Sequence, residues 1–431
     1  MSIPSELFIL PAPRSPFARM DRELAEFDAL QLSVPVVQQA LLGRTGPGPG
    51  SPTAVDLVVW GAVAPSLAVS NWAREVWLDS GLDPHVAAVT VVQQCGTSLA
   101  GATYAAGQIL AGSSHLALCG GVDSMSSVQI GLSRELSQTI RRVASARGFG
   151  RVVSHLRGVR LKDVRLSIPA VKERTTGLSM GEHAEVTARR WEISRVDQDA
   201  LAAASHRHAV GARQDGFYRS LLVSPGTFPT DQDTLPRPDS SEEALSRLTP
   251  AFDRGTGTLT AGNSSPLTDG AAAVWVGDAE GIARLPGRAP AVRLLDWEQA
   301  AVDIDEEGLL QAPALAIPRL LARHGLGYDD VALWEIHEAF AAQVLSTIAA
   351  LEDREWVTER AGVGQDLGSF PRERVNPNGG SIALGHPFGA TGARILSQAA
   401  AELARMSSGS RAVVSVCAAG GLGHVALLQA V

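Results

Sequence analysis

Two stretches of the chain repeat one pattern, and this repetition constrains the fold more than any other feature. LALCGGVDSM (116–125) and VSVCAAGGLGHV (414–425) each place an apolar run before a cysteine and a glycine pair. In each half, a predicted helix rich in Ala and Gly precedes that run. Such small residues let helices approach closely, as two helices buried between sheets must. We therefore infer an internal duplication of one βαβ-rich unit, with a period well above that of solenoid repeats.

The segments around these landmarks alternate between short apolar runs and small-residue helices, which is the signature of α/β layers. Residues 55–63 and 86–92 are predicted as buried strands, and residues 96–112 as a helix. In the second half, residues 379–403 are predicted as a glycine-rich turn entering a helix, and residues 424–431 as a closing strand. The predicted fold class is therefore α/β.

Between Ser124 and Pro250 the pattern changes to basic and polar residues with recurrent turn signals. Within it, residues 181–212 have strongly helical periodicity. We interpret this part as a loop domain inserted in the first half. The predicted domains are 1–123 with 251–285, 124–250 and 286–431.

Composition and charge narrow the classes of function. A hydrophobic share of 45% with 19% charged residues is typical of a globular protein, and a formal net charge of −8 argues against nucleic-acid binding. No signal peptide is visible, nor an apolar run of the roughly 18–20 residues that cross a bilayer. Three cysteines cannot form a disulfide framework and suit a reducing compartment. We therefore expect a cytoplasmic protein.

Cys95 is the first candidate for chemistry. In VVQQCGTSLAGA a predicted strand ends at Gln94, and a helix of small residues begins directly after the cysteine. A thiol at a helix N-terminus faces unpaired N–H groups and the positive end of the helix dipole, which lower its pKa. The alternative is a small buried hydrophobic residue, the usual role of a lone cysteine.

Three more segments place reactive side chains at the ends of predicted elements. In GGSIALGHPFGATG, His386 is expected to be exposed at a helix start, where an imidazole can take and return a thiol proton. In SVCAAGGLGH, Cys417 ends a predicted strand. His337 and Phe340 lie three residues apart in WEIHEAF, and a core histidine with satisfied hydrogen bonds is the alternative for His337. Two cysteines and a histidine suit a nucleophile with a separate proton shuttle.

These segments resemble the thiolase family across essentially the whole chain. QQCGTSLAGA, TAGNSSPLTDGAAA, HEAFAAQ, NPNGGSIALGHPFGATGARI and CAAGGLGH match family signatures in the family's order. The resemblance implies the thiolase fold, with two duplicated βαβαβαββ halves in five α-β-α-β-α layers and an inserted loop domain. HEAFA, where many biosynthetic thiolases have NEAFA, resembles the degradative branch typified by the β-subunit of the trifunctional β-oxidation complex.

The resemblance also implies an activity and a set of roles. The activity is ping-pong thiolysis of 3-ketoacyl-CoA by CoA to acetyl-CoA and a shortened acyl-CoA. Cys95 would accept the acyl group, His386 would activate it, and Cys417 would protonate the departing enolate, since cleaving a C–C bond expels a carbanion. The family's oxyanion holes fall on His386 with a water held by His337, and on the backbone N–H groups of Cys95 and Ala419. Because the charge state of His337 matters, we expect a sharper pH profile than an asparagine would give.

Acyl-CoA and CoA are the implied substrates, and no bound cofactor is expected. The resemblance places Ser265, Met180 and Phe340 at the substrate. Residues 134–174 hold eleven Lys or Arg and three Asp or Glu, a local net charge of +8. We hypothesise that this basic stretch binds the CoA phosphates; a partner subunit, an acidic membrane surface or a solvated loop are the alternatives. The family implies a homodimer or homotetramer, and the branch adds a hydratase/dehydrogenase α-subunit as a candidate partner.

Other chemistry-bearing residues receive structural interpretations. Cys119 is expected to be a packed core thiol, His206 and His208 to lie on a solvated helix face, and Asp269 to cap a following helix. No metal is expected, because no two Cys or His residues have ligand spacing on a hairpin.

Three other functions stay open. A biosynthetic acetoacetyl-CoA thiolase would run the same chemistry backwards. A decarboxylating condensing enzyme resembles thiolases in fold but uses two histidines where thiolases use His and Cys, so Cys417 argues against it. A non-catalytic lipid-binding homologue would not need Cys95, His386 and Cys417 together.

Overall fold

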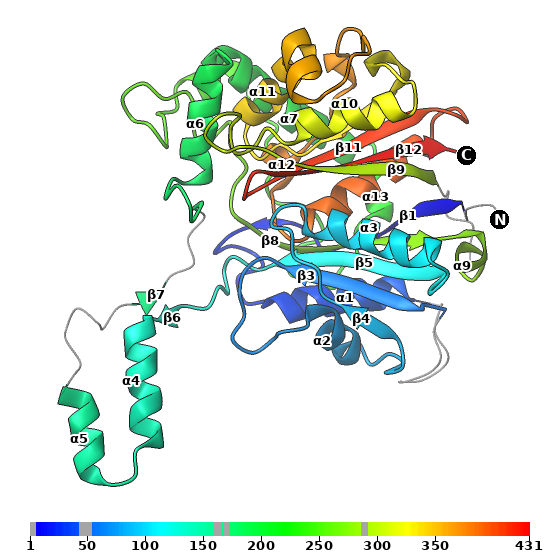
Figure 1. The fold of residues 1–431 in the computed structure, drawn as a ribbon. Helices are drawn as coiled ribbons and strands as arrows, with labels where there is room; N and C mark the ends of the chain where they lie inside the picture. Colours follow the sequence, from blue (N-terminus) through cyan, green and yellow to red (C-terminus); the bar gives the residue numbers. More distant parts are fainter. Residues whose placement is uncertain (1–5, 43–53, 158–165, 168–171, 286–291) are drawn as a thin grey trace. The chain divides into compact units, whose positions relative to one another are not determined.

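A computed structural model describes residues 6–42, 54–157, 166–167, 172–285 and 292–431 (Figure 1). The chain forms two compact units. The larger comprises Met1–Val63, Asn71–Ser127 and Lys172–Val431, and the smaller comprises Ala64–Ser70 and Val128–Val171. The domain boundaries expected from the sequence stay a prediction.

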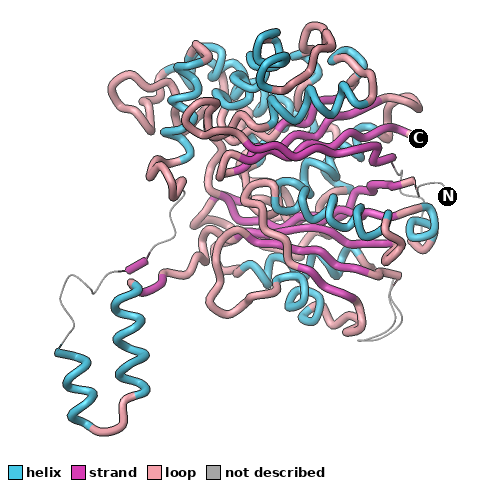
Figure 2. Tube along the Cα trace, in the orientation of Figure 1, coloured by secondary structure: helices cyan, strands magenta, loops and turns pink. Residues whose placement is uncertain are grey.

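Ten strands of the described residues form one sheet in the larger unit. Their order is β10-β11-β12-β9-β1-β8-β5-β3-β4, with β2 paired to β8. Figure 2 draws the strands of the described residues in magenta. The strands are β1 (Leu7–Arg14), β2 (Ala18–Arg19), β3 (Leu57–Ala62), β4 (Ala87–Val89), β5 (Leu116–Asp123), β8 (Thr268–Gly277), β9 (Val292–Ala301), β10 (Leu333–Ile336), β11 (Arg411–Ala418) and β12 (Leu422–Ala430).

The two halves of this sheet repeat each other, which confirms the predicted duplication. In the first half, β1 and β5 pair antiparallel with β8, whereas β3 pairs parallel with β5 and with β4. In the second half, β9 and β11 pair antiparallel with β12, and β10 pairs parallel with β11. A parallel bridge between Trp334 and Val375 stands where β4 stands in the first half. The halves join where β1 pairs with β9.

Helices cover both faces of each half and complete five α-β-α-β-α layers (Figure 1). The outer helices are α1 (Ala29–Ala40) and α2 (Trp72–Asp79) on the first half, and α10 (Pro313–Arg323) and α11 (Ala341–Glu352) on the second. Between the halves, α3 (Thr97–Leu110) packs against α13 (Thr391–Leu403). Their approach is close: a Cβ atom on Gly392 would lie 2.5 Å from the backbone nitrogen of Leu99. The small residues of both helices therefore serve the role predicted for them.

Two details differ from the sequence-based expectation. The strand predicted over 86–92 is only the three residues of β4, and it is partly exposed because it lies at the sheet edge. The helical stretch 181–212 is two helices, α6 (Met180–Arg190) and α7 (Arg195–Gln214), because the chain turns at Glu192, whose φ is 52°. Shorter helices include α8 (Glu242–Ser246), α9 (Ala279–Ala283) and α12 (Ser381–Leu384).

The smaller unit carries much of the basic stretch 134–174. It contains the strand pair β6 (Gly131–Leu132) and β7 (Leu166–Ser167), and the helices α4 (Arg134–Ser145) and α5 (Phe149–Arg157). No residue of α4 is buried. Residues 158–165 and 168–171 of the basic stretch lie outside the described residues. Among the helices that the structure describes, none has the length and apolar character needed to span a membrane.

Candidate active site

Cys95 lies at the turn into α3, as predicted, but the strand before it ends earlier than expected. β4 ends at Val89, and a loop leads to Gln94, which has a φ of 44°. The hydroxyl of Thr97 accepts a hydrogen bond from the backbone N–H of Gln93 at 2.9 Å, which fixes the loop against the first turn of the helix. The sulfur is thus held at the N-terminus of α3 in a defined backbone turn.

The electrostatics of Cys95 differ from the expectation of a lowered pKa. Burial raises the pKa of the thiol to about 12, and the Asp123 charge adds to this effect. Two backbone N–H groups, of Ala419 and of Cys95 itself, hydrogen-bond to the sulfur and oppose the rise. A helix N-terminus therefore does not outweigh desolvation here. The same two N–H groups are those expected to form an oxyanion hole.

His386 stands between α12 and α13 and is buried rather than exposed, with 3% of its surface accessible. Gly385 has a φ of 93°, and a Cβ atom there would lie 2.7 Å from the Thr268 side chain, so only glycine fits this turn. The His386 backbone N–H donates to the Thr268 hydroxyl at 3.1 Å, and its Nδ1 lies 2.6 Å from Thr391 Oγ1. Burial, followed by the Arg394 charge, lowers the pKa of His386 to about 3.

His337 follows β10 and is fully buried beside His386, with ring centroids 4.1 Å apart. Its Nδ1 lies 3.0 Å from Ser381 Oγ. Burial lowers the pKa of His337 well below its ordinary value, and the charges of His386 and Arg394 lower it further. The imidazole is therefore neutral across the physiological range, and the structure does not support the expected sharpening of the pH profile.

The two imidazoles converge on Cys95. One ring nitrogen of each histidine and the Cys95 sulfur lie within 4.8 Å of one another. Three such atoms could hold a metal ion. The sequence analysis considered only Cys and His residues spaced as ligands on one hairpin, whereas these three come from distant parts of the chain. The same arrangement supplies a thiol nucleophile with an imidazole base beside it.

Cys417, Phe340 and Met180 share one apolar cluster. Cys417 is the penultimate residue of β11, and burial raises the pKa of its thiol well above the ordinary value. The Cys95 charge adds to this rise. Phe340 and Met180 belong to the same cluster as Cys417, and the Phe340 ring meets Phe252 edge to face at 5.8 Å. These side chains form an apolar wall beside a buried thiol.

A buried carboxylate, missed in the sequence analysis, holds the two histidine segments together. Glu338 accepts hydrogen bonds from Ser205, from Asn376 and from the backbone N–H of Ile382. Asn376, with a φ of 46°, also bonds both backbone groups of Ile336. The end of β10 is thereby locked to the loop that precedes α12. The sequence could have indicated both residues, because Glu338 lies in the family block HEAFA and Asn376 begins the block NPNGGS.

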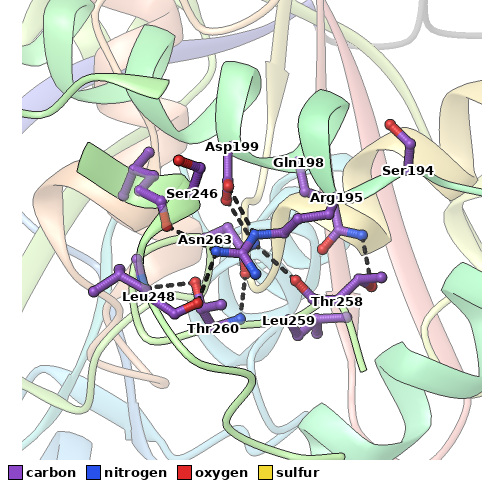
Figure 3. Close-up of polar contacts among 12 residues, drawn as sticks. Ser194, Arg195, Gln198, Asp199, Ser246, Leu248, Thr258, Leu259, Thr260 and Asn263 are labelled. Atoms are coloured by element: carbon purple, nitrogen blue, oxygen red, sulfur yellow. Dashed lines mark hydrogen bonds and ion pairs between the residues drawn. The ribbon is translucent and has the colours of Figure 1, made fainter. Parts of the chain in front are cut away.

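Ser265 follows Asn263 by two residues, and polar contacts from α7 hold Asn263 in place (Figure 3). Arg195 donates to Asp199 at 2.7 Å, and Asp199 accepts from the buried amide of Asn263 at 3.0 Å. The Asn263 carbonyl accepts from the N–H of Ala341 at the start of α11, while Ser265 N–H donates to the Ala339 carbonyl at 3.0 Å. The loop that holds Asn263 and Ser265 is therefore tied to the HEAFA segment that carries His337.

Four residues outside the predicted site were given structural roles from the sequence, and the structure confirms only one of these roles. Cys119 lies in β5 with no accessible surface, as predicted. His206 is buried, and its Nδ1 accepts from the backbone N–H of Arg237, whereas half-buried His208 bonds the Asn376 carbonyl, so neither lies on a solvated face. Asp269 does not cap a helix: it is a buried residue of β8, and it accepts hydrogen bonds from Ser126.

Family models match almost the whole chain. The thiolase N-terminal domain matches residues 7–280 and the thiolase C-terminal domain matches residues 288–430. The chain belongs to the thiolase family. Its relatives include the 3-ketoacyl-CoA thiolase of Pectobacterium carotovorum, 40% identical over 96% of this chain and 94% of that protein. The 3-ketoacyl-CoA thiolase of Vibrio cholerae is 37% identical over 96% and 95%.

Solved thiolase structures share the fold. The acetyl-CoA acetyltransferase of Bacillus anthracis superposes with a TM-score of 0.81 at 29% identity, covering 100% of both chains. The Acat5 thiolase of Ascaris suum, solved in complex with coenzyme A, superposes with a TM-score of 0.79 at 27% identity, covering 99% of this chain and 100% of that one. The described residues of this chain therefore have the thiolase fold.

Proposed function

We propose that the protein is a 3-ketoacyl-CoA thiolase, an acyltransferase that cleaves 3-ketoacyl-CoA with CoA to acetyl-CoA and an acyl-CoA shortened by two carbons. The observation that carries the proposal is the meeting of Cys95 with two imidazoles within 4.8 Å. The family membership and the names of the relatives support the same activity.

The first half-reaction uses Cys95, His386 and Cys417. As the Cys95 sulfur attacks the 3-keto carbon, its proton passes to His386, because a thiol with a raised pKa needs a base to attack at neutral pH. The bond between carbons 2 and 3 then breaks and leaves the acyl group on sulfur. The electron pair passes to the acetyl-CoA enolate, which takes a proton from Cys417. Products of this half are acetyl-CoA and the acyl-enzyme.

The second half-reaction returns the enzyme to its starting state. The proton that His386 holds passes to the Cys417 thiolate, which restores both groups. The thiol of CoA then attacks the acyl-enzyme carbonyl and gives its proton to His386, which returns it to the Cys95 sulfur as that sulfur leaves. The oxyanion that forms on the thioester carbonyl would be bound by the N–H groups of Cys95 and Ala419, which already hydrogen-bond to the sulfur. Each such donor typically contributes about 3 kcal/mol of transition-state stabilisation.

The test is thiolysis of acetoacetyl-CoA and of a long-chain 3-ketoacyl-CoA with CoA, followed as loss of the Mg-enolate absorbance. We expect turnover on at least one chain length and loss of turnover in Cys95→Ala. Folded protein without turnover at any chain length would contradict the proposal and favour a non-catalytic homologue. The relative rates on the two substrates separate a degradative enzyme from a biosynthetic acetoacetyl-CoA thiolase.

The finer parts of the proposal concern the substrate contacts and partners. Ser265, Met180 and Phe340 are proposed to contact the acyl-CoA, which agrees with the apolar cluster that Met180 and Phe340 share with Cys417. A role in fatty-acid β-oxidation is part of the proposal, and the relatives' name, 3-ketoacyl-CoA thiolase, agrees with it. A homodimer or homotetramer and a hydratase/dehydrogenase α-subunit partner are proposed from the family resemblance, and a cytoplasmic location is proposed from the three cysteines of the chain.

A further inference from the structure

The two imidazoles beside Cys95 use one nitrogen each within the protein and leave the other free. Both Nδ1 atoms hydrogen-bond to hydroxyls, whereas His337 Nε2 and His386 Nε2 are buried with no hydrogen-bond partner among the described residues. Buried polar atoms are normally paired, so unpaired atoms at a reaction centre point to a ligand. In a neutral imidazole only one ring nitrogen carries a proton. The hydroxyl bonded to Nδ1 therefore decides whether Nε2 of the same ring donates or accepts.

For His386 that hydroxyl is Thr391. Thr391 Oγ1 lies 2.8 Å from the carbonyl oxygen of Pro387, and two oxygens at this distance need a proton between them. The Thr391 proton therefore goes to Pro387, and its oxygen accepts from His386 Nδ1–H at 2.6 Å. In neutral His386 the Nε2 atom then carries no proton. It is an acceptor, as a base for Cys95 must be.

For His337 the hydroxyl is Ser381, and the assignment is the opposite. Arg394 Nη2 lies 2.9 Å from Ser381 Oγ, and a guanidinium can only donate, so the serine oxygen accepts this bond. Ser381 is fully buried, and the described residues offer its proton one other partner, His337 Nδ1 at 3.0 Å. Ser381 therefore donates to Nδ1. The proton of neutral His337 then resides on Nε2, which is a donor.

We propose that Ser381 and Arg394 are positioning residues that hold His337 as the Nε2–H tautomer, so that this N–H donates directly to the oxyanion formed on the substrate at Cys95. The proposal rests on the thiolase activity proposed above. It replaces the water of the family pattern with the imidazole itself. His337 Nε2 is then the donor and His386 Nε2 the acceptor at one sulfur.

The surroundings of Arg394 suit this role. Arg394 has 2% of its surface accessible, and burial of a charge is costly unless it is paired. Its Nη1 contacts Gln398 Oε1 at 3.4 Å, and Gln398 Nε2 donates to both oxygens of buried Glu335 at 3.2 Å. This chain places the carboxyl group of Glu335 one side chain away from the arginine; burial raises the pKa of Glu335 to about 8, and the Arg394 charge opposes the rise. The Arg394 charge also opposes protonation of His337, which keeps the donor neutral.

The direct test is the protonation of the His337 ring nitrogens in the unmodified, full-length protein. The chain has ten histidines, so ¹⁵N-histidine labelling gives ten pairs of ring signals, and the pair lost in His337→Asn identifies His337. We expect a protonated Nε2 and an unprotonated Nδ1. A protonated Nδ1 would overturn the proposal. This readout needs no turnover, so it stands even if the proposed thiolysis fails.

The kinetic test uses Ser381→Ala, Ser381→Thr and a matched control. Removing the hydroxyl should lower kcat by about 10- to 100-fold with little change in KM, as loss of a supporting hydrogen bond to a catalytic imidazole typically does. In the labelled variant, the two His337 signals should move toward each other as the tautomers exchange. Ser381→Thr keeps the hydroxyl and should recover most of kcat. An unchanged kcat in Ser381→Ala would contradict the proposal.

The control is Ser346→Ala, because Ser346 is an equally buried serine of α11 whose hydroxyl has no hydrogen-bond partner among the described residues. It should keep both kcat and the His337 signals. If it lost kcat as Ser381→Ala does, the loss would reflect packing and the positioning role would be rejected. Absence of turnover in the unmodified protein would instead count against the proposed function, and the ring-nitrogen signals would still decide the tautomer.

Discussion

The imidazoles of His337 and His386 lie with their ring centroids 4.1 Å apart, yet the hydroxyls bonded to their Nδ1 atoms have opposite hydrogen-bonding roles. Thr391 accepts from the Nδ1–H of His386, whereas Ser381 donates to the Nδ1 of His337. Two identical side chains at one sulfur can thus perform opposite tasks without either becoming charged in the resting state. Burial, which lowers the pKa of both, reinforces this division.

Replacing Cys417 should separate the two halves of the reaction. We expect Cys417→Ala to lose C–C cleavage by about 10²- to 10⁴-fold, because this step expels a carbanion that needs a positioned acid. Exchange of labelled CoA into acetyl-CoA should be retained, because that exchange needs only Cys95 and His386. The measurement compares 3-ketoacyl-CoA thiolysis with the exchange rate in the same preparation.

The matched control for this experiment is Cys119→Ala. Cys119 is a buried thiol of β5 outside the site, so its replacement should leave both rates close to those of the unmodified protein. Equal loss of cleavage and exchange in Cys417→Ala would show that Cys417 is needed for acylation itself, contrary to its proposed role.

Replacing His337 should change the rate and not the shape of the pH profile. Loss of an oxyanion donor typically lowers kcat by about 10²- to 10³-fold. The loss of kcat in His337→Asn should be of this size or smaller, because the amide can hold a water in place of the imidazole. Since burial holds the pKa of His337 well below its ordinary value, the group stays neutral at neutral pH in the unmodified protein. Profiles of kcat against pH should therefore superpose after scaling. An acidic limb that disappears in the variant would show that His337 titrates after all.

The sequence was sufficient to predict the duplicated fold, because each half repeats the same strands and small-residue helices. It also identified Cys95 and His386, since family blocks place them at element ends that the duplication brings together. Their electrostatics were not predictable from local sequence. The helix N-terminus next to Cys95 is visible in the sequence, but burial, which raises the pKa of the thiol, is a property of the folded core.

Two other features of the structure could be predicted only in part from the sequence. Ser381 and Arg394 meet because α12 and α13 turn their side chains toward each other, and a linear motif does not show this. His206 was interpreted as solvated because its neighbours in the sequence are polar. It shares a buried stripe of α7 with Ala202 and Ala209, and that 3- to 4-residue spacing was the available signal.

Charge reversal on α4 separates the explanations of the basic stretch 134–174. If the stretch binds the CoA phosphates, Arg141→Glu with Arg142→Glu should raise KM for CoA by about tenfold or more, because each charge-assisted hydrogen bond contributes about 1.5–3 kcal/mol. The same variant should keep its kcat. Steady-state kinetics with CoA as the varied substrate gives both values.

A matched double variant on α7 and the turn after it, Arg207→Glu with Arg219→Glu, reverses the charge of two other exposed arginines. It should leave KM for CoA unchanged. Should the α4 variant also keep its KM and instead lose retention on acidic lipid vesicles or on a partner subunit, the phosphate hypothesis would be wrong.

Buried His206 should make the folded protein sensitive to mild acid. Burial, followed by the Arg237 charge, lowers the pKa of His206 from 6.5 to about 4, although Asp239 opposes the shift. The unfolded chain therefore binds one more proton than the folded chain between these values. Stability from this group is complete above pH 6.5 and is lost as the pH falls towards 4, by up to roughly 3 kcal/mol.

His206→Asn keeps an acceptor for the Arg237 N–H and removes the titration, so its unfolding free energy should fall less steeply between pH 6.5 and pH 4. Urea unfolding across this range measures the slope. Gln214→Asn, at an exposed and non-ionisable side chain of the same helix, is the control and should keep the slope of the unmodified protein. Equal slopes in all three proteins would mean that His206 is protonated in the folded state. Water or the Asp239 charge would then have to stabilise the buried imidazolium.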